Sequence, residues 1–418
     1  MHYLSGRARR FNRAFLCVLA VVFLLTLLKG IRLPNLYSAA HLALNYSQGF
    51  VRRGFLGELS RHVFGDLTFK YWFFVGWSFT ILALIALALA LIVRRVIRAE
   101  PREFGFKAAM LAFAASPGLV MFVHTVGYFD HIGFLATLCL LLWMPRARFR
   151  LLPFYVVVAV GCLLALVHEI LIPMFGPVLF LAMLCHVVRQ APQQSFGMRA
   201  TMGAHAVGAM LLVLVISTLA SAVGVEDRAR VIALQQFIAE RVDYGLRPDL
   251  FEALYRSSER NLNWLMPAYW RIDPPWPLVQ KSFLSILPSY AYLILYGVYT
   301  IVRYPFSKGL RTLIGLTFVG ACLAPLTLNA VGWDWNRWNG IAVLASFSSV
   351  VTLKLFLYSP RRRSSLLVPI LGVIATAIGL ASDTVLFDNA KVQFFPFEQH
   401  ERLLDRLLQR EPRFRPRF

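Results

Sequence analysis

Long apolar runs, separated by short basic connections, dominate the pattern of this chain. A helix of roughly 20 residues crosses the roughly 30 Å of hydrocarbon in a bilayer. Hydrocarbon offers the backbone no hydrogen-bond partner, so each run must pair internally as a helix; the alternating pattern of a membrane barrel is absent. The runs lie at about 14–28, 71–93, 106–124, 132–144, 151–168, 170–188, 201–223, 283–302, 310–330, 340–358 and 365–381. They predict an all-α, polytopic transmembrane helix bundle of about eleven spans.

Three of the runs have more than one interpretation. The runs 132–144 and 151–168 are short and flanked by Pro or Gly, which is typical of re-entrant or broken helices as well as of short spans. The run 14–28 follows four arginines and resembles a secretory signal as well as a first span. Because so many spans follow it, we interpret it as an uncleaved first span.

The distribution of basic residues predicts the orientation of the bundle. Every second connection should lie on the same side of the membrane as the N-terminus, and these connections are rich in Lys and Arg. They contain Arg94, Arg95, Arg98, Arg102, Lys107, Arg146, Arg148, Arg150, Arg189, Arg199, Arg303, Lys308, Arg311, Arg361, Arg362 and Arg363. The positive-inside rule therefore predicts a cytoplasmic N-terminus and, with an odd number of spans, a C-terminal tail on the outside.

Composition narrows the possible classes of function. With 58% hydrophobic and 15% charged residues and a mean hydropathy of +0.62, the chain is not a soluble domain. A net charge of +22 would indicate nucleic-acid binding in a soluble protein, but the basic loops of a membrane protein account for it here. We expect membrane lipid, and no nucleic acid, among the partners. The five cysteines have no paired spacing and predict neither disulfides nor a zinc site.

The runs organise the chain into one transmembrane helical domain, residues 1–381, and an outer C-terminal tail, residues 382–418. Two outer loops are long, 34–70 and 224–282. The second contains VIALQQFIAERV, which has helical periodicity, and NWLMPAYWRIDPPWP, whose aromatic residues suit either the membrane interface or a cap on the bundle. In the tail, ERLLDRLLQR predicts an amphipathic helix.

The first outer loop combines an amphipathic pattern with adjacent arginines. Val51, Phe55, Leu59 and Val63 recur at helical spacing and predict a short helix along the outer surface. Arg52-Arg53 precede it, and planar guanidinium groups bind phosphate or pyrophosphate in two-point contacts. Pairing of both arginines with lipid headgroups is the simpler alternative.

Two further outer connections carry carboxylates beside histidines. Asp130-His131 could serve as a general base or hold a cation, or Asp130 could cap the next helix. His168-Glu169 lies between two apolar runs, where ionisable residues are costly. Burial should raise the pKa of Glu169 and suit it to proton transfer. A structural hydrogen bond between helices is the alternative for this pair.

A late outer connection carries an acid and a base among tryptophans. Trp333, Asp334, Trp335 and Arg337 lie between two apolar runs. Aromatic faces stack on pyranose rings while polar groups hold hydroxyls, so this segment suits a sugar. An aromatic belt with a local pair between Asp334 and Arg337 is the alternative. Because Walker A, GxGxxG and HExxH motifs are absent, we expect a donor from the outer leaflet rather than a cytoplasmic nucleotide.

GFVRRGFLGEL after the first span, the mid-chain HE pair and a late DWNRW make the chain similar to bacterial polytopic envelope proteins. More broadly, it resembles the GT-C class of glycosyltransferases. The resemblance implies an inner-membrane enzyme with a polyprenyl-phosphate-linked sugar donor and a glycan acceptor. The acidic pair typical of the first loop in that class is missing, since Glu58 and Asp66 are isolated. This leaves the identity of the base and any need for a divalent cation open, while the arginines resemble those of surface-polysaccharide polymerases.

These patterns lead to an assignment of roles for transfer at the outer face. The catalytic candidates are Glu169, Asp130, Asp334 and His168, and the substrate-binding candidates are Arg52, Arg53, Arg337, Trp333, Trp335 and His131. Arg52 and Arg53 would hold the lipid phosphate, and Arg337 would stabilise the departing phosphate charge. A transporter or flippase of a lipid-linked sugar or small solute, and a non-catalytic envelope scaffold, are the alternative functions.

Overall fold

Apart from an isolated bridge between Ser47 and Gly49, the described residues form helices and loops. The computed structural model describes residues 6–101, 103–147, 150–191, 194–222, 228–247, 250–251, 254, 276–330, 334–357, 365–384 and 386. The helices of the first half are α1 (Gly6–Gly30), α2 (Leu36–Ala43), α3 (Phe55–Phe64), η1 (Gly65–Phe69), α4 (Tyr71–Ala99), α5 (Phe104–Ala114), α6 (Pro117–His124), α7 (Asp130–Trp143), η2 (Met144–Arg146) and α8 (Leu152–Val167). Those of the second half are α9 (Leu171–Gln190), α10 (Phe196–Ala222), α11 (Arg228–Ala239), α14 (Trp276–Arg303), α15 (Lys308–Thr327), η4 (Leu328–Ala330), α16 (Trp335–Phe356) and α17 (Leu367–Ala381).

Several of these helices are long and apolar enough to cross a membrane. Within the described residues, α1, α4, α9, α10, α14, α15 and α16 meet that criterion, and α5 with α6 makes an eighth span if the bent pair counts as one. Helices α8 and α17 are shorter but apolar. The expectation of an all-helical, multi-pass membrane protein agrees with this architecture, whereas the count of eleven spans and their orientation stay predictions.

A break occurs at Ser116-Pro117, inside the apolar run 106–124, which the sequence pattern predicts as one span. Helices α5 and α6 meet at an angle of 46°. Ser116 caps α6 by accepting a hydrogen bond from the Leu119 amide at 3.1 Å, and Pro117 occupies the first helical turn, where its missing N–H costs nothing. The runs at 132–144 and 151–168, whose pattern also allows broken helices, form the continuous helices α7 and α8.

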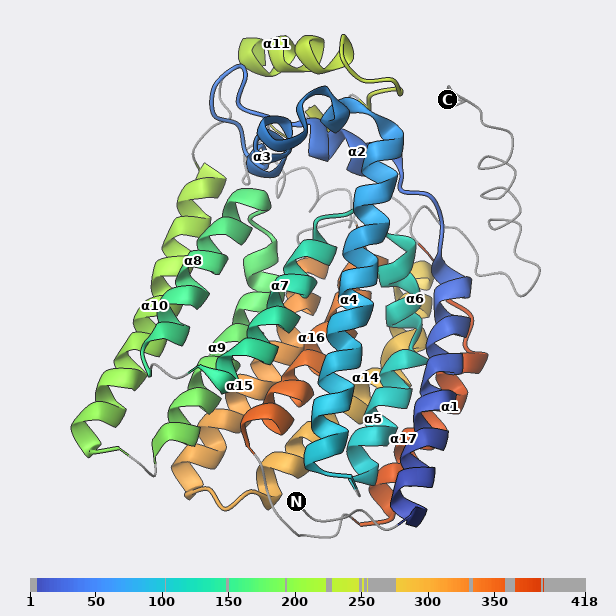
Figure 1. Ribbon diagram of the computed structural model, residues 1–418, viewed down its shortest axis with the longest axis vertical. Coiled ribbons are helices and arrows are strands. Elements are labelled where there is room, and N and C mark those ends of the chain that lie inside the picture. Colours follow the sequence, from blue (N-terminus) through green and yellow to red (C-terminus); the bar gives the residue numbers. More distant parts are fainter. Residues whose placement is uncertain are drawn as a thin grey trace.

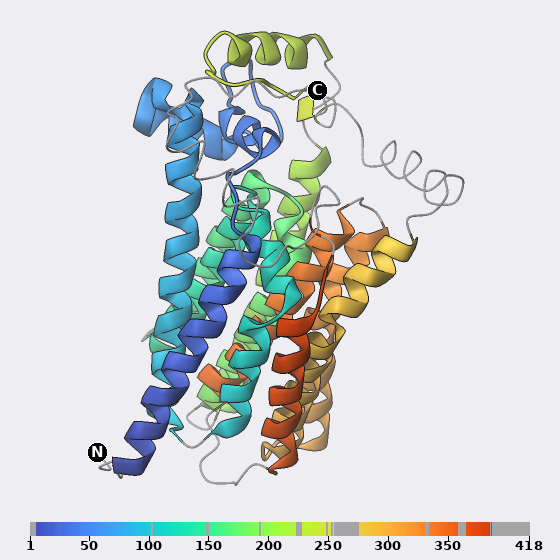
Figure 2. The same ribbon diagram turned by 90° about the vertical axis from the view of Figure 1, so that its right-hand side faces the viewer.

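The bundle has a central helix and two distinct ends. Helix α16 is the core element, because nearly all of its residues from Arg337 to Phe356 are buried, and it packs against α6, α9, α14 and α15. Helices α2, α3 and α11 lie across one end, called here the α3 end, while α1 begins and α4 ends at the opposite end (Figure 1, Figure 2). Helix α11 coincides with the helical periodicity of the second long loop.

Close backbone contact holds α3 against the end of α2 within the first long loop. A Cβ on Gly57 of α3 would lie 1.9 Å from the carbonyl oxygen of Leu44, so only glycine permits this approach. The predicted short helix is present, but its apolar stripe is divided. Val51 is buried, whereas Leu59 and Val63 are 49% and 63% exposed. The exposed part is available to a lipid surface, while the aromatic stretch near 263–275 and the tail helix lie outside the described residues.

Candidate functional site

Arg53 and Glu169 form a two-point ion pair at the α3 end. Arg53 donates from Nη2 to Glu169 Oε1 at 2.6 Å and from Nε to Oε2 at 3.3 Å. The two side chains are only 14% and 19% exposed. Two parallel hydrogen bonds between a guanidinium group and a carboxylate combine charge with fixed geometry, so each residue sets the orientation of the other.

Local backbone features direct both side chains toward this pair. Arg53 lies in a turn in which the Gly54 amide donates to the Val51 carbonyl at 3.3 Å, and its φ of +65° is left-handed. That conformation costs a non-glycine residue roughly 1–2 kcal/mol. On the Glu169 side of the pair, α8 ends at Val167, and the extended backbone of His168 (φ −166°, ψ 118°) separates it from α9. The ion pair thus joins a residue with left-handed backbone, Arg53, to a residue at a break between two helices, Glu169. Strained backbone of this kind is typical of functional sites.

The pairing reverses one expectation from the sequence. Glu169 lies between α8 and α9, outside both helices. Burial alone would raise its pKa, but the Arg53 guanidinium and His168 together hold the pKa of Glu169 well below its usual range. The predicted raised pKa is therefore wrong for this arrangement. Glu169 is an ionised partner of Arg53, and it can act as a base only when Arg53 moves to another anion.

A second two-point ion pair joins α16 to α7. Arg337 donates to both oxygens of Asp130, from Nε at 2.5 Å and from Nη2 at 2.7 Å, and its Nη1 lies 3.1 Å from Asp334 Oδ2. Asp130 is fully buried and Arg337 nearly so. The guanidinium group also lies over the rings of Tyr128 and Trp338. The proposed helix-cap role of Asp130 is not observed, because Asp130 is the first residue of α7 and binds Arg337 instead.

His41 of α2 is close to both ion pairs, since the charges of Arg53 and Arg337 both act on it, and the sequence pattern gives no sign of this role. Its ring stacks on Phe129, with 5.4 Å between centroids, and meets the ring of His168 edge-on at 6.2 Å. Burial, and then the charges of Arg53, His168 and Arg337, hold the pKa of His41 well below its usual range, so the ring is neutral at physiological pH. Among the described residues, His41 Nε2 has no hydrogen-bond partner.

The remaining sequence candidates have different surroundings. His168 Nδ1 lies 3.4 Å from Glu169 Oε2, so it belongs to the first ion pair. Arg52 donates from Nη2 to the Leu254 carbonyl at 3.1 Å. His131 stacks on Phe122, with 4.0 Å between ring centroids. Trp335 is half-buried in the first turn of α16, and Trp333 lies outside the described residues.

The site thus consists of two guanidinium–carboxylate pairs, a neutral imidazole and surrounding aromatic rings. This set can bind a phosphate or pyrophosphate group by exchange of partners and can accept a proton on a carboxylate or on the imidazole. Within the described residues, no group of three or more His, Cys, Asp or Glu side chains is arranged to hold a metal ion. No family model, curated relative or solved structure matches the chain.

Proposed function

We propose that the chain is an integral membrane glycosyltransferase or polysaccharide polymerase that uses a polyprenyl-(pyro)phosphate sugar donor. The observation that carries the proposal is the set of two Arg–carboxylate pairs, Arg53–Glu169 and Arg337–Asp130, whose arginines both act on the buried His41. Buried ion pairs seldom add net stability, so their presence at the end of a membrane bundle favours a functional role. The basic loops at the opposite end support our proposal that the α3 end lies at the outer, periplasmic face of a bacterial inner membrane.

The proposed reaction begins with exchange of partners at Arg53. A donor phosphate competes with Glu169 for the Arg53 guanidinium, since phosphate accepts the same two-point hydrogen bonds. Once Arg53 binds phosphate, the buried Glu169 loses the charge that keeps its pKa low, so it becomes a stronger base. The substrate therefore activates the base that acts on it.

The transfer step replaces the bond from the anomeric carbon to phosphate with a bond to the acceptor oxygen. A hydroxyl of the glycan acceptor loses its proton to Glu169 while its oxygen bonds to the anomeric carbon of the donor sugar. The bond from that carbon to the phosphate oxygen breaks, and the polyprenyl (pyro)phosphate departs with the electron pair. Arg53 and Arg337 stabilise the negative charge on the leaving group. His41 Nε2 is available for a hydrogen bond to a sugar hydroxyl.

The test is sugar transfer by the purified full chain in lipid, supplied with a polyprenyl-linked sugar pool and a glycan acceptor. We expect product from the wild type and none from Glu169→Gln or Arg53→Ala. Lys281→Gln removes a charge from an exposed ion pair and should keep full activity. Full activity of Glu169→Gln would rule out its role as the base. If all forms bind the donor and none transfers it, the transferase proposal fails.

One observation favours transport as a second candidate. Helix α16 carries five polar side chains that are fully buried: Asn339, Ser346, Ser348, Ser349 and Thr352. At the end opposite Arg337, Lys354 of the same helix pairs with Glu100 at 3.3 Å. Polar side chains along a central membrane helix are typical of solute or ion pathways. Movement of a labelled lipid-linked sugar across vesicles, slowed by Ser348→Ala and without product, would support this candidate over transfer.

A further inference from the structure

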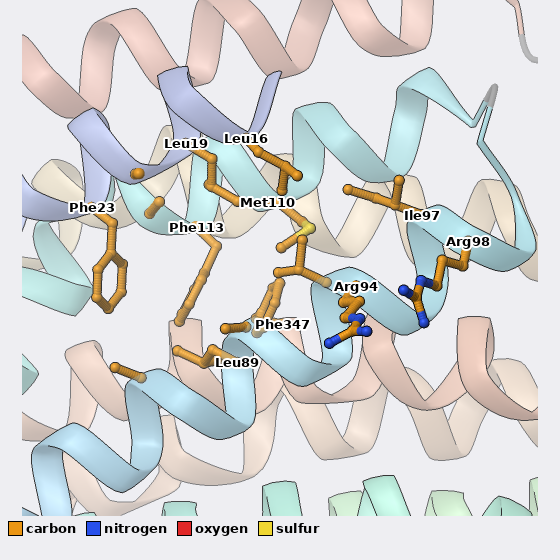
Figure 3. Close-up of a pocket in the computed structure, with 15 residues that line it drawn as sticks. Leu16, Leu19, Phe23, Leu89, Arg94, Ile97, Arg98, Met110, Phe113 and Phe347 are labelled. Carbon is orange, nitrogen blue, oxygen red and sulfur yellow. The ribbon is translucent and has the colours of Figure 1, made fainter. Parts of the chain in front are cut away.

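An apolar groove with a basic end lies between α1, α4, α5 and α16, far along the bundle from the ion pairs at the α3 end. It encloses about 610 Å³, within the range of roughly 300–1,000 Å³ typical of small-molecule sites. Leu19, Phe23, Leu89, Phe113 and Phe347 form much of its wall (Figure 3). Thirteen of its fifteen lining residues are apolar, so the groove suits a hydrocarbon chain.

The two other lining residues are Arg94 and Arg98, which lie together at one end of the groove (Figure 3). Both are exposed and are four residues apart on α4, so they share a helix face. Like charges at this spacing destabilise a helix. Within the described part of the chain, neither arginine makes a hydrogen bond or ion pair, and the nearby Glu100 is bound to Lys354. An anion at this end would relieve the repulsion.

The position of the arginines along α4 identifies the kind of anion. Arg94 and Arg98 occupy the last two turns of a helix of 29 residues, where a spanning helix leaves the hydrocarbon. The apolar wall continues from them toward the middle of the bundle. A ligand that matches this order has a charged group at the membrane interface and an apolar chain directly below it. Basic pockets between helices at this depth bind anionic lipid headgroups.

Small side chains leave room for such a chain. Ala86 and Ala90 lie one turn apart on α4, and Ala20 faces the groove from α1. Helix α1 packs mainly against α5 and α6. A bound chain would therefore fill the space that α1 and α4 leave between them.

We propose that this groove binds one anionic diacyl phospholipid from the leaflet at the Arg94 end, with its phosphate on Arg94 and Arg98 and one acyl chain along Ala86, Leu89 and Ala90. Charge complementarity selects the headgroup, and the apolar wall holds the chain. The site is separate from Arg53 and Arg337, which are proposed to bind the lipid-linked sugar at the other end. The inference does not depend on the proposed function.

Native mass spectrometry of the purified full chain tests the proposal, with phosphatidylglycerol and phosphatidylcholine of identical acyl chains and with a polyprenyl phosphate. We expect one phosphatidylglycerol molecule to bind roughly tenfold or more tightly than phosphatidylcholine, because each arginine near the surface contributes to the attraction. The variant Arg94→Gln/Arg98→Gln should lose that preference. The control Arg199→Gln/Lys308→Gln removes two charges from exposed positions outside the groove and should keep it.

A second variant tests the acyl chain. Ala90→Trp fills the groove and should weaken binding of both phospholipids while leaving the two arginines in place. No preference for phosphatidylglycerol in the wild type, or a preference that persists in the double arginine variant, would refute the headgroup assignment. Unchanged binding by Ala90→Trp would refute the chain assignment. Tighter binding of polyprenyl phosphate than of phosphatidylglycerol would overturn the choice of ligand.

Discussion

Arg53 and Glu169 are 116 positions apart in the chain, yet they share two hydrogen bonds at the α3 end. The pair connects the first long loop to the break between α8 and α9. It is also only slightly exposed, so water screens its charges weakly. Loss of either partner therefore leaves a charge buried without compensation, and this has consequences for stability as well as for function.

We predict that Glu169→Leu destabilises the protein by about 3 kcal/mol, the lower end of the cost of breaking a buried pair. Adding Arg53→Met should recover most of the loss, because an apolar pair of similar volume needs no compensation. Thermal unfolding of both variants in detergent measures the effect. The exposed pair Lys281–Asp383 provides the control, and Asp383→Ala should change stability by no more than about 1 kcal/mol. A double variant as unstable as Glu169→Leu would contradict the argument.

The low pKa of His41 predicts a pH dependence of stability. The groups that lower it, beyond burial, are Arg53, His168 and Arg337, while Glu169 opposes them. Below a pH of about 6.5, an unfolded His41 binds a proton that the folded protein excludes. The contribution of His41 to the free energy of unfolding is therefore fully present above that pH. It falls as the pH decreases, by up to about 1.4 kcal/mol per pH unit for one proton.

A substitution of His41 separates its part of the pH dependence of stability from that of the other histidines. His41→Phe keeps a ring against Phe129 but cannot titrate. Its loss of stability between pH 6.5 and 5 should be smaller than that of the wild type, measured by thermal unfolding at each pH. Identical pH profiles would mean that folding does not lower the pKa of His41.

The sequence predicted the elements of this fold better than their contacts. Apolar length alone located each of the helices α1, α4, α9, α10, α14, α15 and α16, because a membrane restricts the backbone to helices. The bend at Ser116-Pro117 had a signal, a capping serine before a proline, but it lies inside a continuous apolar run. Local pattern resolves helix starts poorly where hydrophobicity does not change.

For the candidate site too, the sequence predicts the residues but not their contacts. Polar residues in apolar surroundings identified Arg53, Asp130, Glu169 and Arg337, because burying a charge is costly. Their ion-pair partners cannot be predicted from the sequence, because Arg337 and Asp130 are 207 positions apart and only the fold brings them together. His41 was missed because a single histidine in a short helix carries no local signal. The expected pKa of Glu169 was wrong for the same reason, since it depends on a partner from another loop.

The orientation of the bundle makes a prediction that labelling can test. If the α3 end is outside, a cysteine at the exposed position Val63 should react with a membrane-impermeant maleimide in intact cells. A cysteine at the exposed Lys308, at the opposite end, should react only after the membrane is opened. The background would lack the exposed Cys17 and Cys139. The reverse pattern of labelling would invert the predicted topology and move the proposed transfer to the cytoplasmic face.

Gly57 offers a test of how the first loop positions Arg53. A methyl group there would lie 1.9 Å from the Leu44 oxygen and 2.4 Å from the Leu42 oxygen, both backbone atoms that cannot move without displacing α2 or α3. We predict that Gly57→Ala destabilises the protein by about 1–3 kcal/mol, the usual cost of overpacking, and lowers activity because the turn at Arg53 directly precedes α3.

Gly76→Ala is the matched control for this prediction. Gly76 is in the interior of α4 with open space around it, so alanine there should be neutral or stabilising by roughly 0.5–1 kcal/mol. Thermal unfolding and the transfer assay on both variants separate the two effects, and a Gly57→Ala protein with the stability and activity of Gly76→Ala would show that the loop does not depend on this contact.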